Sequence, residues 1–134
     1  MFPVSIKGVL VLPSDAVVLA LNDRDEWELP GGRIEIGERS TECLVREFKE
    51  ELGVDVEANG LIDTYLFEVI PGKHVFIVTY GCRLVGRFSP VVSHEHSKIA
   101  TFPIDDLPAN LPSGYAHSIR CSQACTNGAA VPLA

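Results

Sequence analysis

No hydrophobic run in this sequence is long enough to cross a membrane. The longest apolar stretches, Val9 to Pro13 and Ala16 to Leu21, fall far short of the roughly 20 residues that a spanning helix needs. The chain also opens without the charged and then apolar pattern of a secretion signal. We therefore expect a cytoplasmic protein that has no contact with membranes.

Positive charge is scarce as well. Asp and Glu number 18 against 11 Lys and Arg, which gives a formal net charge of −7 at pH 7, and Lys and Arg never gather in a run. Such a surface repels nucleic acid backbones and anionic membranes unless a bound metal or a local basic patch offsets the charge. A nucleic acid polymer is therefore not an expected partner, and 134 residues suffice for one domain with a single core.

Cysteine is sparse, and its spacing predicts no disulfide. The four cysteines are scattered, with Cys43 in a predicted helix and Cys82 in a predicted strand, so we expect reduced and mostly buried thiols. Cys121 and Cys125 are spaced for one helix face and could bind a metal. No second cysteine pair or nearby histidine pair completes such a site, which favours the buried-thiol interpretation.

A dense group of carboxylates lies between Gly31 and Val54. A glycine-rich loop opens this stretch, and a predicted helix follows in which Glu47, Glu50 and Glu51 fall on one face. Like charges at this spacing cost roughly a few tenths of a kcal/mol on an exposed helix, and two carboxylates about 4 Å apart near a protein surface repel by up to ~4 kcal/mol. A bound cation would turn this cost into a gain.

The order of the residues in this stretch follows a known pattern. Reading onward from Gly32, five residues precede Glu38, and seven more precede the run Arg46-Glu47-Phe48-Lys49-Glu50-Glu51-Leu52-Gly53-Val54. This order resembles the Nudix box, G-x(5)-E-x(7)-R-E-U-x-E-E-x-G-U with U an apolar residue, at every specified position. The preceding segment, Trp27-Glu28-Leu29-Pro30-Gly31, also looks like the usual entry to that box.

The resemblance implies a reaction and a set of metal ligands. Nudix hydrolases cleave a phosphoanhydride in a nucleoside diphosphate linked to another group, by attack of water at phosphorus. The reaction needs charge cancellation on the phosphate oxygens and an aligned water, which hard divalent ions held by carboxylates supply. By this resemblance Glu47 and Glu51 are the first expected ligands of Mg²⁺ or Mn²⁺, with Glu50 a third ligand or near neighbour and the carbonyl of Gly31 an additional one.

Two further residues of the box have an expected supporting role. The resemblance implies that Arg46 and Glu38 orient the ligands without touching the reacting phosphate, a task that suits the arginine fork. Glu35 and Glu42 are interpreted as solvated charges of the loop and the helix start, although Glu35 is close enough in sequence to reach a water near the ligands.

The general base is expected outside the box. Glu95, flanked by His94 and His96, matches a position where many relatives carry a catalytic or metal-binding glutamate. An exposed polar loop is an equally good interpretation of the same three residues. The catalytic set predicted from the sequence is therefore Glu47, Glu50, Glu51 and Glu95.

Local patterns predict the boundaries of the box helix. We expect Ser40 to be its N-cap and Gly53 to follow its last turn. At about 100° per residue, three apolar residues form one stripe that faces the core, with Val45 beside them: Leu44, Phe48 and Leu52.

The remaining pattern predicts an α+β protein. Strands are expected over residues 4–11, 16–21, 54–57, 61–70, 74–84 and 98–102, and a second helix over 113–125. This order predicts a mixed sheet covered by two helices, which the resemblance sharpens to the Nudix fold, an α/β/α sandwich. Residues 1–125 are expected to form one domain, and residues 126–134, which have no periodic pattern, a frayed tail.

Substrate-binding residues cannot be assigned from the sequence. Trp27 is interpreted as a core or rim aromatic, and Tyr65, Phe67 and Phe76 as ordinary core aromatics, although each could stack a nucleobase.

The predicted function is that of a metal-dependent pyrophosphohydrolase acting on a small nucleotide, such as a nucleoside triphosphate, a nucleotide-sugar or an ADP-ribose type of substrate. The alternatives are a catalytically silent Nudix-fold domain for nucleotide binding or regulation, and a plain solvated acidic face. Because no acidic position of the box is missing, the enzyme is favoured. The oligomeric state is open, a homodimer included.

Overall fold

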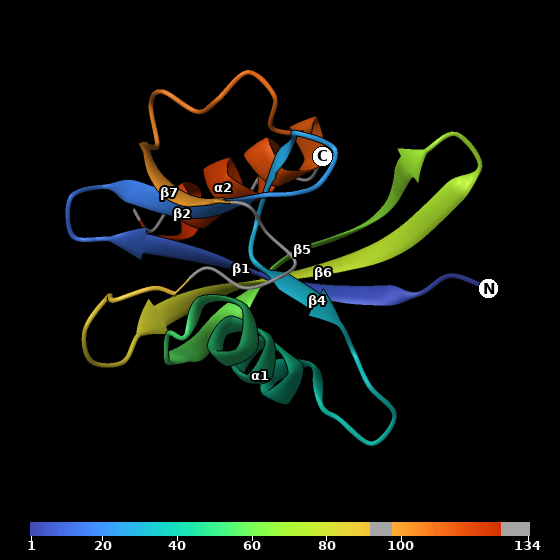
Figure 1. The fold of residues 1–134 in the computed structure, drawn as a ribbon, viewed down its shortest axis with the longest axis horizontal. Coiled ribbons are helices and arrows are strands. Elements are labelled where there is room, and N and C mark those ends of the chain that lie inside the picture. Colours follow the sequence, from blue (N-terminus) through green and yellow to red (C-terminus); the bar gives the residue numbers. More distant parts are fainter. Residues whose placement is uncertain (92–97, 127–134) are drawn as a thin grey trace.

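A seven-stranded mixed sheet lies between two helices in the computed structural model, which describes residues 1–91 and 98–126 (Figure 1). The main strand order is β3-β2-β1-β6-β5, with β4 beside β1 and β7 beside β2. In chain order the elements are β1 (Val4–Leu12), β2 (Ala16–Leu21), β3 (Trp27–Glu28), β4 (Gly31–Arg33), α1 (Ser40–Leu52), β5 (Val56–Ile70), β6 (Lys73–Leu84), β7 (Lys98–Pro103) and α2 (Ser113–Thr126).

Strand β1 lies at the centre of the sheet. It pairs in parallel with β6, from Val4 opposite Phe76 to Leu10 opposite Cys82. Along its other side it pairs first with β4 and then with β2, both antiparallel. Because β4 leads into α1, the pairing of β1 with β4 fixes where the acidic helix begins.

Alternate residues of β1 point to two different cores, as expected for a strand buried on both faces. Ile6 and Leu10 pack with the apolar residues of α1, whereas Val9 packs with residues of α2. Figure 1 shows α1 and α2 on opposite sides of the sheet. The predicted α+β class and the α/β/α sandwich are therefore confirmed.

Helix α1 begins at Ser40, so the prediction that Ser40 is its N-cap is wrong. The cap is Arg39, whose backbone N–H donates to Oε1 of Glu42 at 2.8 Å. The Ser40 hydroxyl instead bonds the hydroxyl of Tyr80 on β6 at 2.6 Å. At the other end Gly53 follows the last turn, as predicted. It adopts the left-handed conformation, with φ 68°, and its N–H donates to the carbonyl of Lys49.

The apolar stripe of α1 is narrower than predicted. Its three central members are 0–1% exposed, which confirms their place in the core: Leu44, Phe48 and Leu52. Val45 is 39% exposed, so its expected place beside them is wrong. One residue further along the helix is a rotation of about 100°, which turns Val45 away from the sheet.

One long strand replaces the two strands predicted for residues 54–57 and 61–70. Strand β5 runs without a break past Asn59 and Gly60, and its pairing with β6 shifts register on either side of Leu61. A β-bulge absorbs residues that look like a turn in the sequence, since Gly60 takes a φ of 139°. The resulting β5–β6 hairpin extends beyond the rest of the sheet (Figure 1).

The predictions for β4, α2 and the tail had different outcomes. Strand β4 was not predicted, whereas α2 is present and ends at Thr126. The predicted tail of residues 126–134 lies, beyond Thr126, outside the described residues, so its fraying stays a prediction. In the described part of the chain, neither helix is long and apolar enough to span a membrane.

Candidate active site

The candidate site lies where β1, β4 and α1 meet. Gly31 on β4 pairs with Lys7 on β1, and its backbone N–H donates to Oε2 of Glu51 at 3.2 Å. Gly31 has a φ of 142°, and any side chain there would run into the carbonyl of Ile6. Only glycine can therefore bring the β4 backbone to this carboxylate.

Glu47 lies directly against the next glycine. A Cβ on Gly32 would come within 2.5 Å of the carboxylate carbon of Glu47. The Glu47 side chain is only 12% exposed, and Glu51 is 4% exposed. The glycine pair thus leaves room for two largely buried carboxylates, the two residues predicted as first metal ligands.

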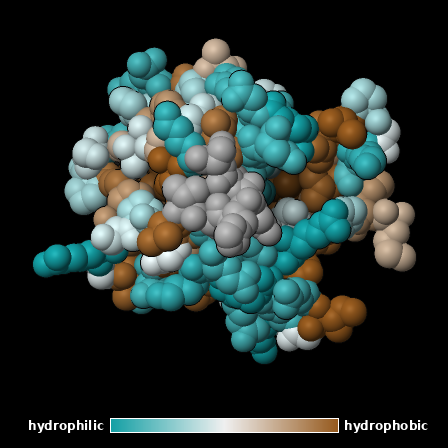
Figure 2. All heavy atoms as spheres, viewed as in Figure 1, coloured by the Kyte–Doolittle hydropathy of each residue, from teal (hydrophilic) through white to brown (hydrophobic). Residues whose placement is uncertain are grey.

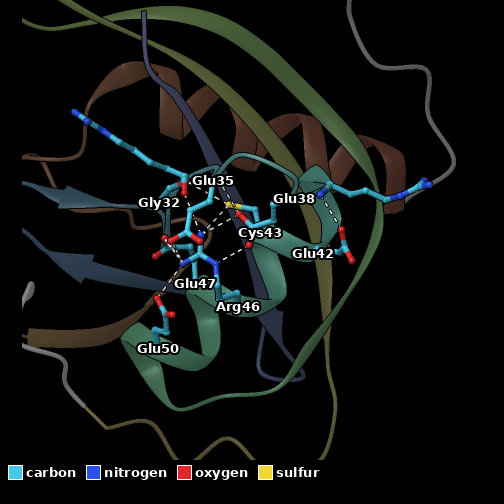
Figure 3. Close-up of polar contacts among 10 residues, drawn as sticks. Gly32, Glu35, Glu38, Glu42, Cys43, Arg46, Glu47 and Glu50 are labelled. Atoms are coloured by element: carbon cyan, nitrogen blue, oxygen red, sulfur yellow. Dashed lines mark hydrogen bonds and ion pairs between the residues drawn. The ribbon is translucent and has the colours of Figure 1, made fainter.

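The guanidinium of Arg46 joins the loop to the helix (Figure 3). Its Nε and Nη2 bind both carboxylate oxygens of Glu38, at 2.6 and 3.1 Å. Its Nη1 donates to Glu47 at 3.1 Å and to Glu50 at 3.0 Å, and Nη2 also donates to the carbonyl of Arg33 at 3.1 Å. A fork bound in this way fixes the helix carboxylates relative to β4. We call Arg46 with Glu38, Glu47 and Glu50 the arginine network.

The arginine network holds its charges strongly. The hydrogen bonds from Arg46, and one from the Glu35 backbone N–H at 3.0 Å, lower the pKa of Glu38 from 4.5 to about 2. The same contact with Glu38 raises the pKa of Arg46. Both side chains therefore stay ionised at any physiological pH.

Glu50 is the exposed member of the network, and two other acidic residues, Glu35 and Glu42, lie near it. Glu50 is 59% exposed, and Glu35 is 69% exposed with its carboxylate 3.7 Å from Arg46, so Glu35 is a solvated charge that also faces the network. Glu42 is more than a solvated charge, because it bonds the Arg39 N–H. Figure 2 shows hydrophilic residues over α1 on this face.

The donor set fits a hard divalent ion. Within residues 1–91 and 98–126, no three His, Cys, Asp or Glu side chains converge on one point, because Arg46 binds Glu47 and Glu50 while Glu51 faces the Gly31 N–H. Carboxylate and carbonyl oxygens are nevertheless the ligands that Mg²⁺ and Mn²⁺ prefer. Largely buried carboxylates also need cationic partners, and Glu47 and Glu51 both line the glycine loop.

Two groups of residues predicted to have functional roles lie partly or wholly outside the described residues: the histidines with Glu95, and the cysteine pair of α2. His94, Glu95 and His96 lie in the segment 92–97, outside the described residues, so the role of Glu95 stays a prediction. On α2, Cys121 lies 3.4 Å from Nε2 of His117, and the side chain of Cys125 lies outside the described residues.

The described thiols are buried, as predicted: Cys43, Cys82 and Cys121. Cys43 and Cys82 are also free thiols. Burial raises the pKa of Cys43 and of Cys82 to about 12, so neither thiol ionises at neutral pH.

The aromatic residues separate into core and surface. Trp27 is 8% exposed and meets the Phe102 ring edge-on, at 4.8 Å between centroids, which confirms it as a core aromatic. Phe67 likewise packs edge-on against Tyr115 at 5.8 Å. Phe76 is 37% exposed, so the prediction that it is a core residue is wrong; it lies on the distal part of the β5–β6 hairpin.

Sequence reasoning missed one charged residue near the site. Lys7 is only 6% exposed in the middle of β1. Burial works to lower its pKa, but four neighbouring groups together raise the pKa above its usual value: Tyr115, Glu28, Glu51 and Glu47. The ammonium therefore stays charged. The available signal was a single charged residue within the mostly apolar run Val4–Leu12.

The mixed sheet, its two covering helices and the glycine-led acidic helix define a Nudix fold. The chain belongs to the Nudix hydrolase family: the family model described as the NUDIX domain matches residues 1–121. A MutT-like protein from Streptomyces ambofaciens is 41% identical over 115 residues, which cover 84% of this chain and 71% of that protein. An 8-oxo-dGTP diphosphatase from Proteus vulgaris is 40% identical over 57 residues, 40% of this chain and 50% of that protein.

A solved structure agrees with the fold. The crystal structure of a MutT NUDIX hydrolase from Burkholderia pseudomallei matches with a TM-score of 0.79 at 23% identity, over 90% of this chain and 97% of that one. At this identity the likeness shows the fold alone. The chain spans half or less of the length of several curated relatives that it matches.

Proposed function

We propose that the chain is a metal-dependent pyrophosphohydrolase that cleaves a phosphoanhydride bond in a nucleoside diphosphate linked to another moiety. Membership of the Nudix hydrolase family, with a diphosphatase among the named relatives, supports the reaction class. The observation that carries the proposal is the placement of two largely buried carboxylates, Glu47 and Glu51, against the backbone of Gly31 and Gly32.

In this proposal the helix carboxylates hold a divalent ion. Glu47 and Glu51 are its main ligands, with Glu50 and the Gly31 carbonyl as further ones. Bound Mg²⁺ or Mn²⁺ supplies charge neutralisation at the phosphate oxygens and a more acidic water. The part of Arg46 is positional, because its fork keeps the carboxylates aligned with the loop.

The proposed reaction consumes only the substrate and one water molecule. The oxygen of a water molecule bonds to phosphorus, the bridging P–O bond breaks, and the leaving phosphate oxygen takes the electron pair. The proton of the water passes to a carboxylate base. Glu95 is the base that the family resemblance nominates. In Glu95→Gln a rate far below wild type supports that role, and a near-wild-type rate removes it.

The proposed substrates are small nucleotides of three kinds: a nucleoside triphosphate, a nucleotide-sugar and ADP-ribose. The net charge of −7 disfavours a nucleic acid polymer.

The test is a panel of these three substrates with Mg²⁺, with Mn²⁺ and with a chelator. We expect cleavage of at least one substrate only with the metal, and in ¹⁸O-labelled water the label should enter a phosphate product. Glu51→Gln should lower turnover by on the order of 10²-fold or more, as when one charge-stabilising group leaves an active site.

Glu57→Gln is the matched control, because Glu57 is an exposed carboxylate at the start of β5 that pairs with Arg83 and is not one of the proposed ligands. It should cleave at the wild-type rate. If wild type cleaves none of the substrates in a metal-dependent way, the chain is a catalytically silent Nudix-fold domain.

A further inference from the structure

A cavity of about 530 Å³ opens on the α2 side of β1, next to β4. Among the described residues, its lining holds one carboxylate, Glu28, against four basic side chains: Lys7, Arg24, Arg33 and Lys73. This local excess of positive charge stands out in a chain whose net charge is −7. A cavity charged in this way favours an anion.

Lys7 differs from the other basic residues of the cavity. Arg33 and Lys73 are exposed, and Arg24 pairs with exposed carboxylates of its own turn, whereas Lys7 is 6% exposed. Its ammonium lies 5.8 Å from the centre of the Tyr115 ring on α2. Its backbone pairs with Gly31, the residue whose N–H bonds Glu51. Lys7 therefore links the cavity to the glycine loop.

A buried ammonium needs negative charge close by. In the ion-free protein the fields of Glu51, Glu47 and Glu28 supply it. A divalent ion held by Glu47 and Glu51 would cancel their share and leave Lys7 beside a net positive centre. A diphosphate at the same place would restore the balance, since it brings several negative oxygens.

We propose that Lys7 is an anion-binding residue that holds a phosphate oxygen of the substrate's diphosphate once the acidic helix has bound its metal. This inference rests on the proposed function and adds a residue on the opposite face of the sheet. It makes metal and diphosphate binding reciprocal. The metal removes the repulsion between the carboxylates and the diphosphate, and the diphosphate removes the repulsion between Lys7 and the metal. Lys7 thereby favours the complete metal and diphosphate pair over the metal alone.

A purely structural role for Lys7 leads to a different expectation. If its ammonium only offsets the carboxylates, its removal changes the stability of the fold and the affinity for the metal. It does not change the affinity for a diphosphate in the metal-saturated protein. That second affinity is the readout that separates the two roles.

The experiment is a calorimetric titration of wild type and Lys7→Met, first with Mg²⁺ and then, at saturating Mg²⁺, with inorganic pyrophosphate. Methionine keeps the length of the side chain and suits a buried site. Lys7→Met should bind Mg²⁺ alone more tightly than wild type does. It should bind pyrophosphate about 10- to 100-fold more weakly, as expected for the loss of one charge-assisted hydrogen bond.

Lys49→Met is the charge-matched control. Lys49 lies on the same acidic helix, is 61% exposed, and pairs with Asp55 at 3.2 Å away from the cavity. It makes the same change in net charge, so it should shift pyrophosphate affinity by less than about threefold, as exposed ion pairs do. An equal loss in both variants would mean that net charge alone is responsible and would overturn the assignment to Lys7.

A measurement on the wild-type protein covers the case in which Lys7→Met does not fold. Reductive methylation of lysine amines, followed by mass spectrometry of peptides, should slow at Lys7 when Mg²⁺ and pyrophosphate are both present. The rate at Lys49 in the same sample should stay constant. Equal methylation of Lys7 with and without the two ligands, or unchanged pyrophosphate affinity in a folded Lys7→Met, overturns the proposal.

The outcome also separates this inference from the proposed function. If wild type shows metal-dependent cleavage while Lys7→Met keeps wild-type pyrophosphate affinity, only the proposal for Lys7 is wrong and the proposed function stands. If wild type neither cleaves the substrate panel nor binds pyrophosphate with Mg²⁺, both proposals are wrong.

Discussion

The two sides of the β1–β4 pair present opposite charges to the candidate site. On the α1 side, carboxylates of the loop and helix gather around Arg46 and are held by direct hydrogen bonds of 2.6 to 3.1 Å. On the α2 side, Lys7 lies in a cavity with several basic side chains, and the field of neighbouring groups keeps its ammonium charged against the cost of burial.

This difference indicates how each side responds to change. Hydrogen bonds depend on the position of each atom, so the acidic side should be sensitive to shape. A buried charge depends on the sum of its surroundings, so Lys7 should be sensitive to any charge that arrives nearby. We therefore expect the acidic side to depend on the position of its atoms and the basic side to depend on the charge bound near it.

The largest expected effect comes from removing a buried side chain that packs the acidic helix α1 against the sheet. Phe48 is 0% exposed and packs between α1 and the sheet, so Phe48→Ala should lower the free energy of unfolding by ~3–5 kcal/mol through lost burial and a cavity. Denaturant unfolding measures this. Val45→Ala is the control on the exposed face and should change stability by about 0.5 kcal/mol or less. A Phe48→Ala cost below ~1 kcal/mol would mean that this face of the helix is misassigned.

Gly32→Ala tests the sensitivity to shape directly. The added Cβ would lie 2.5 Å from the Glu47 carboxylate, so that side chain must move. Turnover should fall by on the order of 10²-fold, as when a reacting geometry shifts by about 1 Å. The melting temperature should change little, because the added Cβ meets the far end of a side chain and no backbone atom. Ile36→Ala, an exposed change in the same loop, should leave turnover intact. A fully active Gly32→Ala would show that the position of Glu47 is unimportant.

Arg46→Lys asks whether charge alone can replace the fork. Lysine keeps the positive charge but cannot bind both oxygens of Glu38 and reach Glu47 as well. We expect a turnover about 10- to 100-fold lower, the usual loss when a group that orients metal ligands is removed. Steady-state kinetics at saturating Mg²⁺ decides this, and wild-type turnover in Arg46→Lys would argue against an orienting role.

The smallest effect concerns acid stability. The pKa of Glu38 is lowered from 4.5 to about 2 in the folded protein. The ionised Glu38 therefore contributes fully to the free energy of unfolding above pH 4.5, and this contribution is lost as the pH falls toward 2. Glu38→Gln has no such carboxyl, so its stability deficit relative to wild type should shrink over that range. Thermal unfolding at a series of pH values measures the difference, and a deficit that stays constant with pH would exclude the ion pair as its source.

The acidic side could be predicted from the sequence because it is local. Gly32, Glu38, Arg46 and the helix glutamates lie within one continuous stretch, where helical periodicity already puts carboxylates on one face. The strand boundaries were harder. A bulge at Gly60 and the three-residue strand β4 depend on partners elsewhere in the chain.

The basic side could not be predicted, because distant segments form it. Lys7, Glu28 and Tyr115 come together only through the pairing of β1 with β2 and of β2 with β3, and through the packing of α2. Ser40 illustrates the same limit at short range. Serine is a residue type that often caps helices, but here the N–H of Arg39 donates to the Glu42 carboxylate. The cap therefore lies at Arg39, one residue earlier.

The most direct measurement is a calorimetric titration of the folded wild-type protein with Mg²⁺ and with Mn²⁺, with and without a nucleotide. We predict saturable ion binding that is abolished in the double variant Glu47→Gln, Glu51→Gln and preserved in Glu57→Gln. Absence of ion binding to wild type under both conditions would contradict a site built on the carboxylates of α1.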